Sequence, residues 1–148
     1  MSGSIAKLPV AAAIVALCGL IDSVYLTIHH YTAEPVPCTI MGGCEMVLTS
    51  GYAEIYGIPL AAFGALAYLS AISLALLTLF GFRKLWMLFG AQATIMAGFS
   101  CWLIYIQAVI IQAFCQFCLL SALSSILLLT IFIISLFVRP PSSGAQSI

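Results

Sequence analysis

Two cysteines separated by two residues, Cys115 and Cys118, are the side chains best suited to covalent chemistry in this chain. They stand in the run Phe114-Cys115-Gln116-Phe117-Cys118, at the head of a long apolar stretch. Thiols at positions i and i+3 of a helix share one face and can form a disulfide. A helix N-terminus also favours the thiolate, which is the reactive form. The spacing indicates a redox-active pair, although two thiols packed on a buried face would share it.

A second pair, Cys38 and Cys44, lies in the longest polar stretch of the chain. Pro35 and Pro37 stiffen the approach to Cys38, and two glycines precede Cys44. Two neighbouring dithiols can pass a disulfide between them through mixed disulfides, so the second pair favours redox chemistry. Four cysteines would also suffice in number for zinc, but the Cys-x5-Cys spacing does not match the short zinc knuckle. We therefore expect no metal site.

The elements that position these cysteines are membrane-spanning helices. Of 148 residues, 64% are hydrophobic and 5% are charged, which leaves too apolar a surface for a water-soluble domain. Four runs with few or no charges reach the roughly 20 residues needed to cross a hydrocarbon core. The sequence predicts an all-α membrane protein, a single domain over residues 1–148 with a four-transmembrane-helix bundle. The expected spans are residues 8–28, 58–80, 85–111 and 115–138.

The connections between the spans carry their own predictions. Residues 29–57 form a long outer loop with the first cysteine pair. Within this loop, the sequence of residues 44–56 predicts a short helix that lies on the membrane. The residues of this helix expected to dip inward are Val47, Tyr52 and Ile55. We expect residues 140–148, rich in proline and serine, to be a disordered tail.

Charge places both cysteine pairs on one side of the membrane. All Lys and Arg residues fall on the side of the two termini and the middle turn: Lys7, Arg83, Lys84 and Arg139. The positive-inside rule makes this side, including both termini, cytoplasmic. Both cysteine pairs then face the periplasmic or extracytoplasmic side of the cell membrane, in an oxidising compartment that suits disulfides. The formal net charge of zero gives no reason to expect nucleic acid, and we expect a monomer.

Several residues within the spans are candidates for function or close packing. Asp22 interrupts the first span, and an acid within a membrane segment is a functional candidate. Its alternative is a structural carboxyl bonded to Ser23 or Tyr25. Phe63 and Tyr68 could line a pocket for a planar ligand or could simply pack in the bundle. In the third span, small residues at a spacing of four favour close helix contact: Gly90, Thr94 and Gly98.

The position of Cys115 and Cys118 (the helix pair) restricts the choice of electron acceptor. An acceptor that approaches from the lipid must be apolar, small and capable of two-electron reduction. The sequence has no flavin or nicotinamide fingerprint and no haem-attachment motif, so a quinone fits best. We expect ubiquinone or a menaquinone of the vitamin K type, in contact with Phe63, Tyr68, Phe114 and Cys118. Cys38 and Cys44 in the exposed loop (the loop pair) would instead meet a soluble protein.

The order of these motifs along the chain is also that of a known family. The Cys38-x5-Cys44 loop is followed by Ser50, by the run Gly-Ile-Pro-Leu-Ala-Ala-Phe-Gly at 57–64, and by the final Phe-Cys-Gln-Phe-Cys. In this order the chain resembles a prokaryotic vitamin K epoxide reductase homologue. The resemblance extends from Asp22 through the last helix. An analogous four-span bacterial disulfide oxidase carries its CxxC in the first outer loop instead.

The resemblance implies a role for each site residue. Cys38 would exchange with a soluble thioredoxin-like partner, and Cys44 would form a relay disulfide with Cys115. Cys118 would be the thiolate that faces the quinone. Ser50 would support the active site, and a simple helix-end hydrogen bond is its alternative role. The protein would then be a quinone-dependent thiol oxidoreductase that supports disulfide formation in exported proteins.

The chain also departs from the family's vertebrate enzymes. Leu60 and Ala122 occupy the positions where those enzymes have an Asn and a Tyr beside the quinone. We therefore expect neither polar recognition of the quinone carbonyls at these positions nor epoxide reduction. Some prokaryotic members carry a fused thioredoxin-like domain. Since this chain ends soon after Arg139, its partner is expected to be a separate protein.

Two other classes of protein stay open. A small proton-coupled transporter would use Asp22 as its carboxylate and act as a dimer, with the cysteines incidental. A structural four-span protein would have an outer loop stapled by disulfides that do not cycle. Transport assays with blocked thiols test the first class. Reduction and reoxidation of the cysteines in the presence of quinone test the second.

Overall fold

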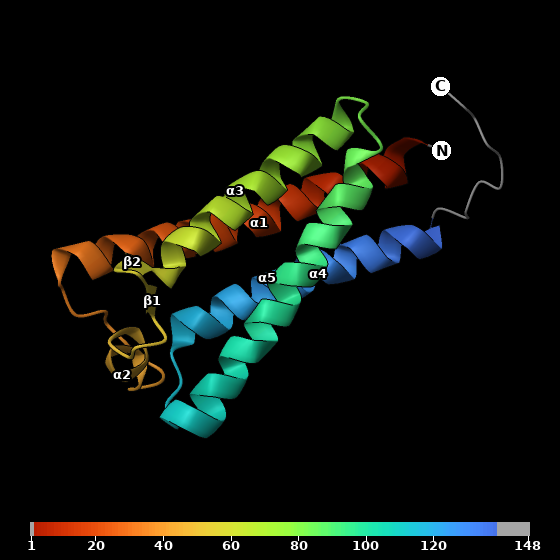
Figure 1. Ribbon diagram of the computed structural model, residues 1–148. Coiled ribbons are helices and arrows are strands. Elements are labelled where there is room, and N and C mark those ends of the chain that lie inside the picture. Colours follow the sequence, from red (N-terminus) through yellow and green to blue (C-terminus); the bar gives the residue numbers. More distant parts are fainter. Residues whose placement is uncertain (1, 139–148) are drawn as a thin grey trace.

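Four long helices make up most of the chain. The computed structural model describes residues 2–138, with side chains from residue 6, so the tail expected at 140–148 lies outside it. The long helices are α1 (Ser2–Thr32), α3 (Leu60–Leu79), α4 (Leu85–Tyr105) and α5 (Gln116–Val138) (Figure 1). All four are long and apolar enough to cross a membrane, α4 together with the π-helix η1 (Ile106–Ile111). The predicted all-α membrane bundle is confirmed.

The first and last helices begin or end at residues other than those expected. α1 continues past residue 28 to Thr32, so His29 and His30 lie on the helix rather than in the loop. α5 begins at Gln116, and the Cys115 carbonyl accepts a hydrogen bond from the Leu119 N–H at 3.0 Å. Cys115 is therefore the residue that caps α5, just outside the fourth span.

Small residues let the helices approach closely. α1 packs against α3 and α5, and α4 packs against the same two helices. Buried alanines fill the α1–α3 contact: Ala12, Ala16, Ala71 and Ala75. Gly90 of α4 lies under the ring of Phe132 in α5, where a Cβ would overlap the ring. Gly98, from the same predicted stripe, has open space where its Cβ would be, so only part of the stripe lies at a helix contact.

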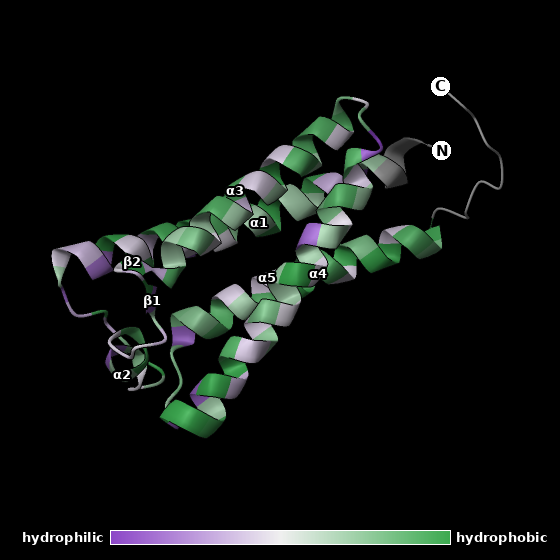
Figure 2. Cartoon of the chain, viewed as in Figure 1, coloured by the Kyte–Doolittle hydropathy of each residue, from purple (hydrophilic) through white to green (hydrophobic). Residues whose placement is uncertain are grey.

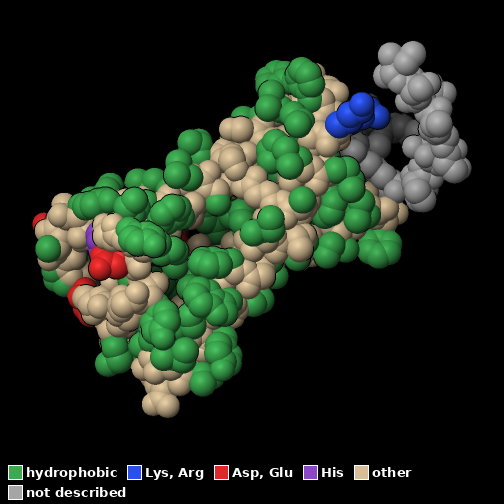
Figure 3. Space-filling view, viewed as in Figure 1, with side chains coloured by type: hydrophobic (Ala, Val, Ile, Leu, Met, Phe, Trp, Pro, Cys, Tyr) green, Lys and Arg blue, Asp and Glu red, His purple; other side chains and the backbone are tan. Residues whose placement is uncertain are grey.

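The two ends of the bundle differ in charge. Hydrophobic residues run along the middle of all four helices (Figure 2). On the face shown in Figure 3, Lys and Arg gather near the α3–α4 turn, and Asp and Glu gather at the opposite end, beside the loop. Arg83 and Lys84 belong to that basic turn. The α2 loop and the start of α5, which carry the two cysteine pairs, lie at the end of the bundle away from the basic turn (Figure 1).

The outer loop forms a shorter helix than predicted. Helix α2 covers only Cys44–Leu48, whereas the sequence predicted a helix over residues 44–56. A hairpin follows, in which β1 (Glu54–Ile55) pairs antiparallel with β2 (Ile58–Pro59). The turn residues between the strands both have positive φ angles, as tight hairpin turns require.

Local side-chain hydrogen bonds explain the early end of α2. The Thr49 hydroxyl donates to the Glu45 carbonyl at 2.6 Å, and the Ser50 hydroxyl donates to the Val47 carbonyl at 2.6 Å. Such bonds satisfy the last carbonyls of the helix and compete with its continuation. As a result, Val47 is buried, as predicted, but Tyr52 and Ile55 are exposed rather than directed inward.

Candidate active site

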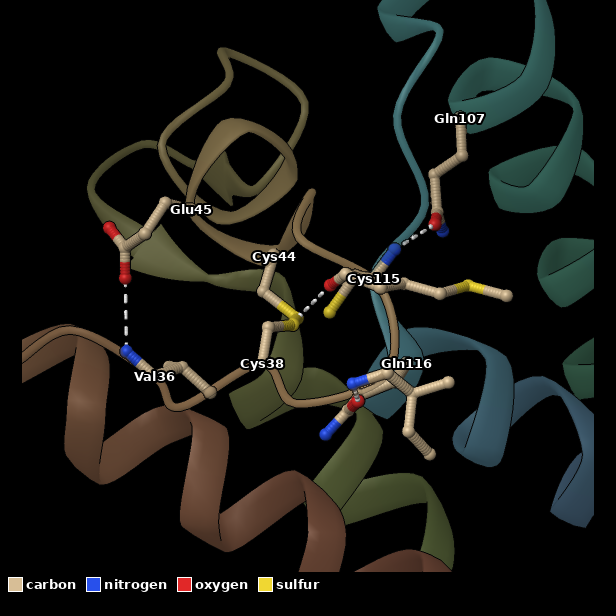
Figure 4. Close-up of a disulfide and its surroundings, with 9 residues drawn as sticks. Val36, Cys38, Cys44, Glu45, Gln107, Cys115 and Gln116 are labelled. Carbon is tan, nitrogen blue, oxygen red and sulfur yellow. Dashed lines mark hydrogen bonds between the residues drawn. A yellow bond between two sulfur atoms is a disulfide. The ribbon is translucent and has the colours of Figure 1, made fainter.

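The loop brings its cysteine pair onto the CxxC segment. Cys38 and Cys44 form a disulfide whose Cα atoms lie 6.0 Å apart, and Cys115 and Cys118 are free thiols. Cys44 and Cys115 are fully buried and pack with Val47 in one apolar cluster. In Figure 4 the sulfur of Cys115 points toward the disulfide. The four cysteines predicted to act together thus lie in one small region.

The two sulfurs of the loop disulfide differ in accessibility. Cys44 is completely buried, while Cys38 is partly exposed. Cys38 follows Pro37 in an extended stretch without helix or strand. Cys38 is therefore the cysteine of this pair that can be approached from water, whereas Cys44 is not.

Two contacts hold the loop against the CxxC segment, and a third braces the loop internally. The Ile40 N–H donates to Oε1 of Gln116, the residue after Cys115, at 3.0 Å (Figure 4). Gly43 lies so close to the Phe114 carbonyl that a Cβ would come within 2.8 Å of its oxygen. Further out, the Val36 N–H donates to Oε1 of Glu45 at 2.9 Å. These contacts fix the loop over the start of α5.

The π-helix η1 positions Cys115 from the other side. Gln107 is buried in η1, and its Oε1 accepts a hydrogen bond from the Cys115 N–H at 3.0 Å. Its backbone carbonyl accepts a second bond from the Ala113 N–H at 3.1 Å. Gln112 then turns the chain with a left-handed φ of 57°. Short π-helices often mark functional sites, and this one sets the register of the CxxC segment.

Of the two free thiols, Cys115 is unusually acidic. The pKa of Cys115 is lowered to about 7, chiefly because the Cys118 thiol donates a hydrogen bond to its sulfur. Burial opposes this effect, and the backbone N–H groups of Cys118 and Phe117 add to it. A negative charge on Asp22 would raise the same pKa by a smaller amount. The Cys115 thiol therefore loses its proton more readily than an ordinary cysteine.

A cavity of about 740 Å³ lies beneath the loop, between the helices. Cys118 lines it, whereas Cys115 does not, so the two thiols face different surroundings. The cavity also reaches the outer surface of the bundle between α3 and α4. Three of its lining residues are substantially exposed there: Phe63 (44%), Ile95 (72%) and Phe99 (44%). An apolar ligand can therefore enter from the lipid.

The residues expected to contact a cofactor fall in different places. Phe63, Tyr68 and Cys118 line the cavity, but Phe114 does not. Tyr68 is almost fully buried, and its hydroxyl is occupied by the Ser121 carbonyl at 2.6 Å and the Ser125 hydroxyl at 3.0 Å. Its ring, rather than its hydroxyl, is therefore free for ligand contact.

Ser50, Leu60 and Ala122 also line the cavity. Ser50 uses its hydroxyl to bond the Val47 carbonyl, which is the helix-end role considered as its alternative. Because Val47 packs against Cys44 and Cys115, this bond also steadies the cysteine cluster. Leu60 and Ala122 add only apolar surface to the cavity wall.

Asp22 lines the same cavity with a carboxyl group that has no partner. Its side chain is 6% exposed, and neither oxygen has a hydrogen-bond partner among residues 6–138. The bond to Ser23 or Tyr25 that was considered as its alternative role is therefore not formed. Other buried side-chain polar atoms in that part of the chain are satisfied, which makes Asp22 an exception.

Three residues of the site were not identified from the sequence: Gly43, Gln107 and Gln116. Gln107 offered a signal, because it is a polar residue near the end of an apolar span. Gln116 and Gly43 gave none, since their roles depend on how the loop folds back onto α5.

Comparison with known proteins agrees with this architecture. A sequence profile described as the Vitamin K epoxide reductase family matches residues 10–133. The chain is also 35% identical over 116 residues to the thiol-disulfide oxidoreductase LTO1 of Arabidopsis thaliana. The matched region covers 72% of this chain but 31% of that relative, so the chain spans about a third of the relative's length. On the profile match across most of its length, the chain belongs to the vitamin K epoxide reductase family.

Proposed function

We propose that this protein is a membrane thiol–disulfide oxidoreductase that passes electrons from a soluble thioredoxin-like protein to a membrane quinone. The observation that carries the proposal is the contact of buried Cys44 with Cys115, between an accessible Cys38 and a cavity lined by Cys118. Similarity to the plant thiol-disulfide oxidoreductase supports the same reaction class. In the cell, this reaction would support disulfide formation in exported proteins.

The first step is exchange with the soluble partner. A partner thiolate attacks the accessible sulfur of Cys38, and Cys44 leaves as a thiolate. A second partner thiol then displaces Cys38, so the partner gains a disulfide and the loop pair is reduced by two electrons. Cys44 is the leaving sulfur because it is buried and cannot be attacked from water.

The second step moves the electrons between the two pairs. The Cys44 thiolate attacks Cys115 of an oxidised Cys115–Cys118 disulfide, and Cys118 leaves as a thiolate. Cys38 then attacks Cys44, which restores the loop disulfide and releases Cys115. A low leaving-group pKa speeds such exchange, and the pKa of Cys115 is lowered to about 7. The arrangement described above, with the loop oxidised and the helix pair free, is the one that this step would produce.

The cavity fits a quinone. Its volume of about 740 Å³ lies within the range of small-molecule sites, and its wall is mostly apolar. Phe63, Tyr68, Leu60 and Ala122 would hold the ring and its first side-chain atoms. When bound, a quinone accepts two electrons and two protons. As a bond forms between the sulfurs of Cys115 and Cys118, two electrons leave the pair and the Cys118 thiol loses its proton.

The location of the protein in the cell follows from the same proposal. We place it in the cell membrane with both termini in the cytoplasm and the cysteine pairs outside, where the substrate disulfides form. Its partner would be a periplasmic or extracytoplasmic thioredoxin-fold protein. The accepted quinone would be ubiquinone or a menaquinone of the vitamin K type.

Reconstitution in lipid nanodiscs tests the electron path. With a reduced thioredoxin-like protein as donor and menadione as acceptor, the full chain should reduce the quinone. Alanine at any of the four paired cysteines should abolish turnover. Cys18→Ala and Cys101→Ala are matched controls that should retain it, because both thiols lie exposed on the outside of the spans. Absence of quinone reduction by the unmodified protein would overturn the proposal.

A trapping experiment tests the entry point. Cys44→Ala removes the residue that resolves the complex, so it should accumulate a mixed disulfide between Cys38 and the partner. Cells are quenched in acid, alkylated and compared on non-reducing gels with Cys38→Ala. An adduct found only in Cys38→Ala would reverse the roles of the two residues. No adduct in either variant would indicate a structural disulfide.

A further inference from the structure

Asp22 is a buried acid in the first span that the electron path does not use. Both oxygens of its carboxyl lack a partner among residues 6–138, although its side chain is only 6% exposed. Burying an ionised carboxylate without a partner is strongly unfavourable. A carboxyl group in such a place is therefore either paired with a cation or neutral. No Lys or Arg stands near it in the sequence or in the described loop. The carboxyl therefore rests in its protonated form, with a free O–H.

The position of Asp22 links it to the reacting thiols. It lines the same cavity as Cys118, on α1, which packs against α5. Among the acids of the chain it is the one held in a span rather than in the loop.

Proton counting shows why a second donor is needed. Forming the Cys115–Cys118 bond releases two electrons, but once Cys115 has become a thiolate the pair carries a single proton. A quinone that takes up two electrons requires two protons to become a hydroquinone. One proton comes from the S–H of Cys118. A protonated group that lines the cavity can supply the other directly.

We propose that the carboxyl of Asp22 hydrogen-bonds a quinone oxygen in this cavity and supplies the second proton. The proposal rests on the quinone-reducing function proposed above. The O–H bond of Asp22 breaks, its proton goes to the quinone oxygen, and Asp22 becomes a carboxylate. The quinone then receives two electrons from the sulfurs, one proton from Cys118 and one proton from Asp22, so the reaction balances.

The cavity also provides a route by which Asp22 regains its proton. The cavity extends from Asp22 to polar residues at its outer mouth: His29, His30, Glu34, Glu45 and Glu54. His30 lies 3.6 Å from Glu54 across this mouth. Asp22, Leu26 and His29 fall on one face of α1, at spacings of four and three residues. Protons from the outer solution can therefore reach the carboxylate once the hydroquinone has left.

The experiment separates proton donation from thiol exchange. Asp22→Asn keeps the size and a hydrogen-bond donor but cannot release a proton. With the helix pair reduced in advance, single-turnover reduction of menadione should slow by about 100-fold or more, the usual contribution of a general acid. Exchange between the loop pair and the helix pair, followed by alkylation and mass mapping, should be unchanged. Thr78→Ala removes a buried polar group away from the cavity and should reduce menadione at the normal rate.

An infrared measurement gives a readout that does not depend on turnover. In the reduced, unmodified protein, the band of a protonated carboxyl should shift when menadione is added, and this response should be missing in Asp22→Asn. If no carboxyl band responds in the unmodified protein, or if Asp22→Asn reduces menadione at the normal rate, the role of Asp22 is overturned. If the unmodified protein does not reduce quinone at all, the failure belongs to the proposed function.

Discussion

At the scale of single residues, each paired cysteine has its own environment. Cys38 is reachable from water, Cys44 and Cys115 share a dry cluster, and Cys118 lines the cavity. A disulfide can therefore move inward by successive exchange without exposing the inner sulfurs. The lowered pKa of Cys115 gives this sequence a preferred leaving group.

The pKa of Cys115 leads to a testable titration. In a Cys18→Ala/Cys101→Ala background with the loop disulfide intact, the ultraviolet absorbance of one thiolate should appear with a midpoint near pH 7. A lowered pKa means that the thiolate is present above this pH and is lost below it. Cys118→Ala removes the main hydrogen-bond donor, so the midpoint should move upward. Cys118→Ser keeps a donor and should give a smaller shift. A midpoint unchanged in Cys118→Ala would contradict the assigned cause.

At the scale of elements, the site depends on how the outer loop meets the connection between η1 and α5. Gln107 accepts a hydrogen bond from Cys115, and Gln116 accepts one from the loop. Gly43 allows the loop to approach the CxxC segment closely. A small displacement at this contact moves Cys44 relative to Cys115.

Two adjacent glycines test this contact. Gly43→Ala would place a Cβ 2.8 Å from the Phe114 carbonyl, whereas Gly42→Ala meets nothing within 4 Å. In a Cys38→Ala/Cys118→Ala background, Gly43→Ala should lower the rate of Cys44–Cys115 disulfide formation by about tenfold, because small misplacements strongly slow reactions between fixed groups. Gly42→Ala should form the disulfide normally. Equal rates in the two variants would show that the loop does not need this close contact.

A second pair of glycines tests helix packing. Gly90→Ala forces a Cβ into the ring of Phe132 and should destabilise the bundle by about 1–3 kcal/mol. Gly98→Ala meets open space on the same helix and serves as the matched control. Thermal unfolding in detergent would measure both. A greater loss of stability in Gly98→Ala than in Gly90→Ala would contradict the observed α4–α5 contact.

At the scale of the whole molecule, the basic α3–α4 turn and the segments that carry the paired cysteines lie at opposite ends of the bundle. The lysines and arginines fix orientation by the positive-inside rule, so the cysteine end should face outward. The positions of the basic residues and of the cysteines are two independent features of the sequence, and they predict the same orientation.

Accessibility labelling tests this orientation. In a background without Cys18 and Cys101, a cysteine at Tyr56, which is fully exposed in the loop hairpin, should react with an impermeant reagent added to intact cells. A cysteine at Phe82, exposed beside the basic turn, should react only after the membrane is opened. The reverse pattern would place the redox site in the cytoplasm.

The sequence predicted the bundle because hydrophobic length is a strong and local signal, and the four spans follow from it. It did not predict the end of α2 at Leu48, since that depends on hydroxyl groups of Thr49 and Ser50 competing with the backbone. Of the site, the cysteines could be identified from spacing alone. Their roles stay predictions, as do those of Ser50, Phe63 and Tyr68. The unpartnered state of Asp22 could not be foreseen, because it depends on which neighbours fail to reach it.

The opening of the cavity between α3 and α4 has a consequence for how activity should be measured. Phe63, Ile95 and Phe99 line that opening on the lipid-facing surface. The concentration that governs turnover is then the mole fraction of quinone in the bilayer, not its amount per volume of buffer. At fixed quantities of protein and quinone, adding quinone-free lipid in vesicles should slow the reaction in proportion to the dilution of the membrane. Adding buffer should leave the rate per molecule unchanged.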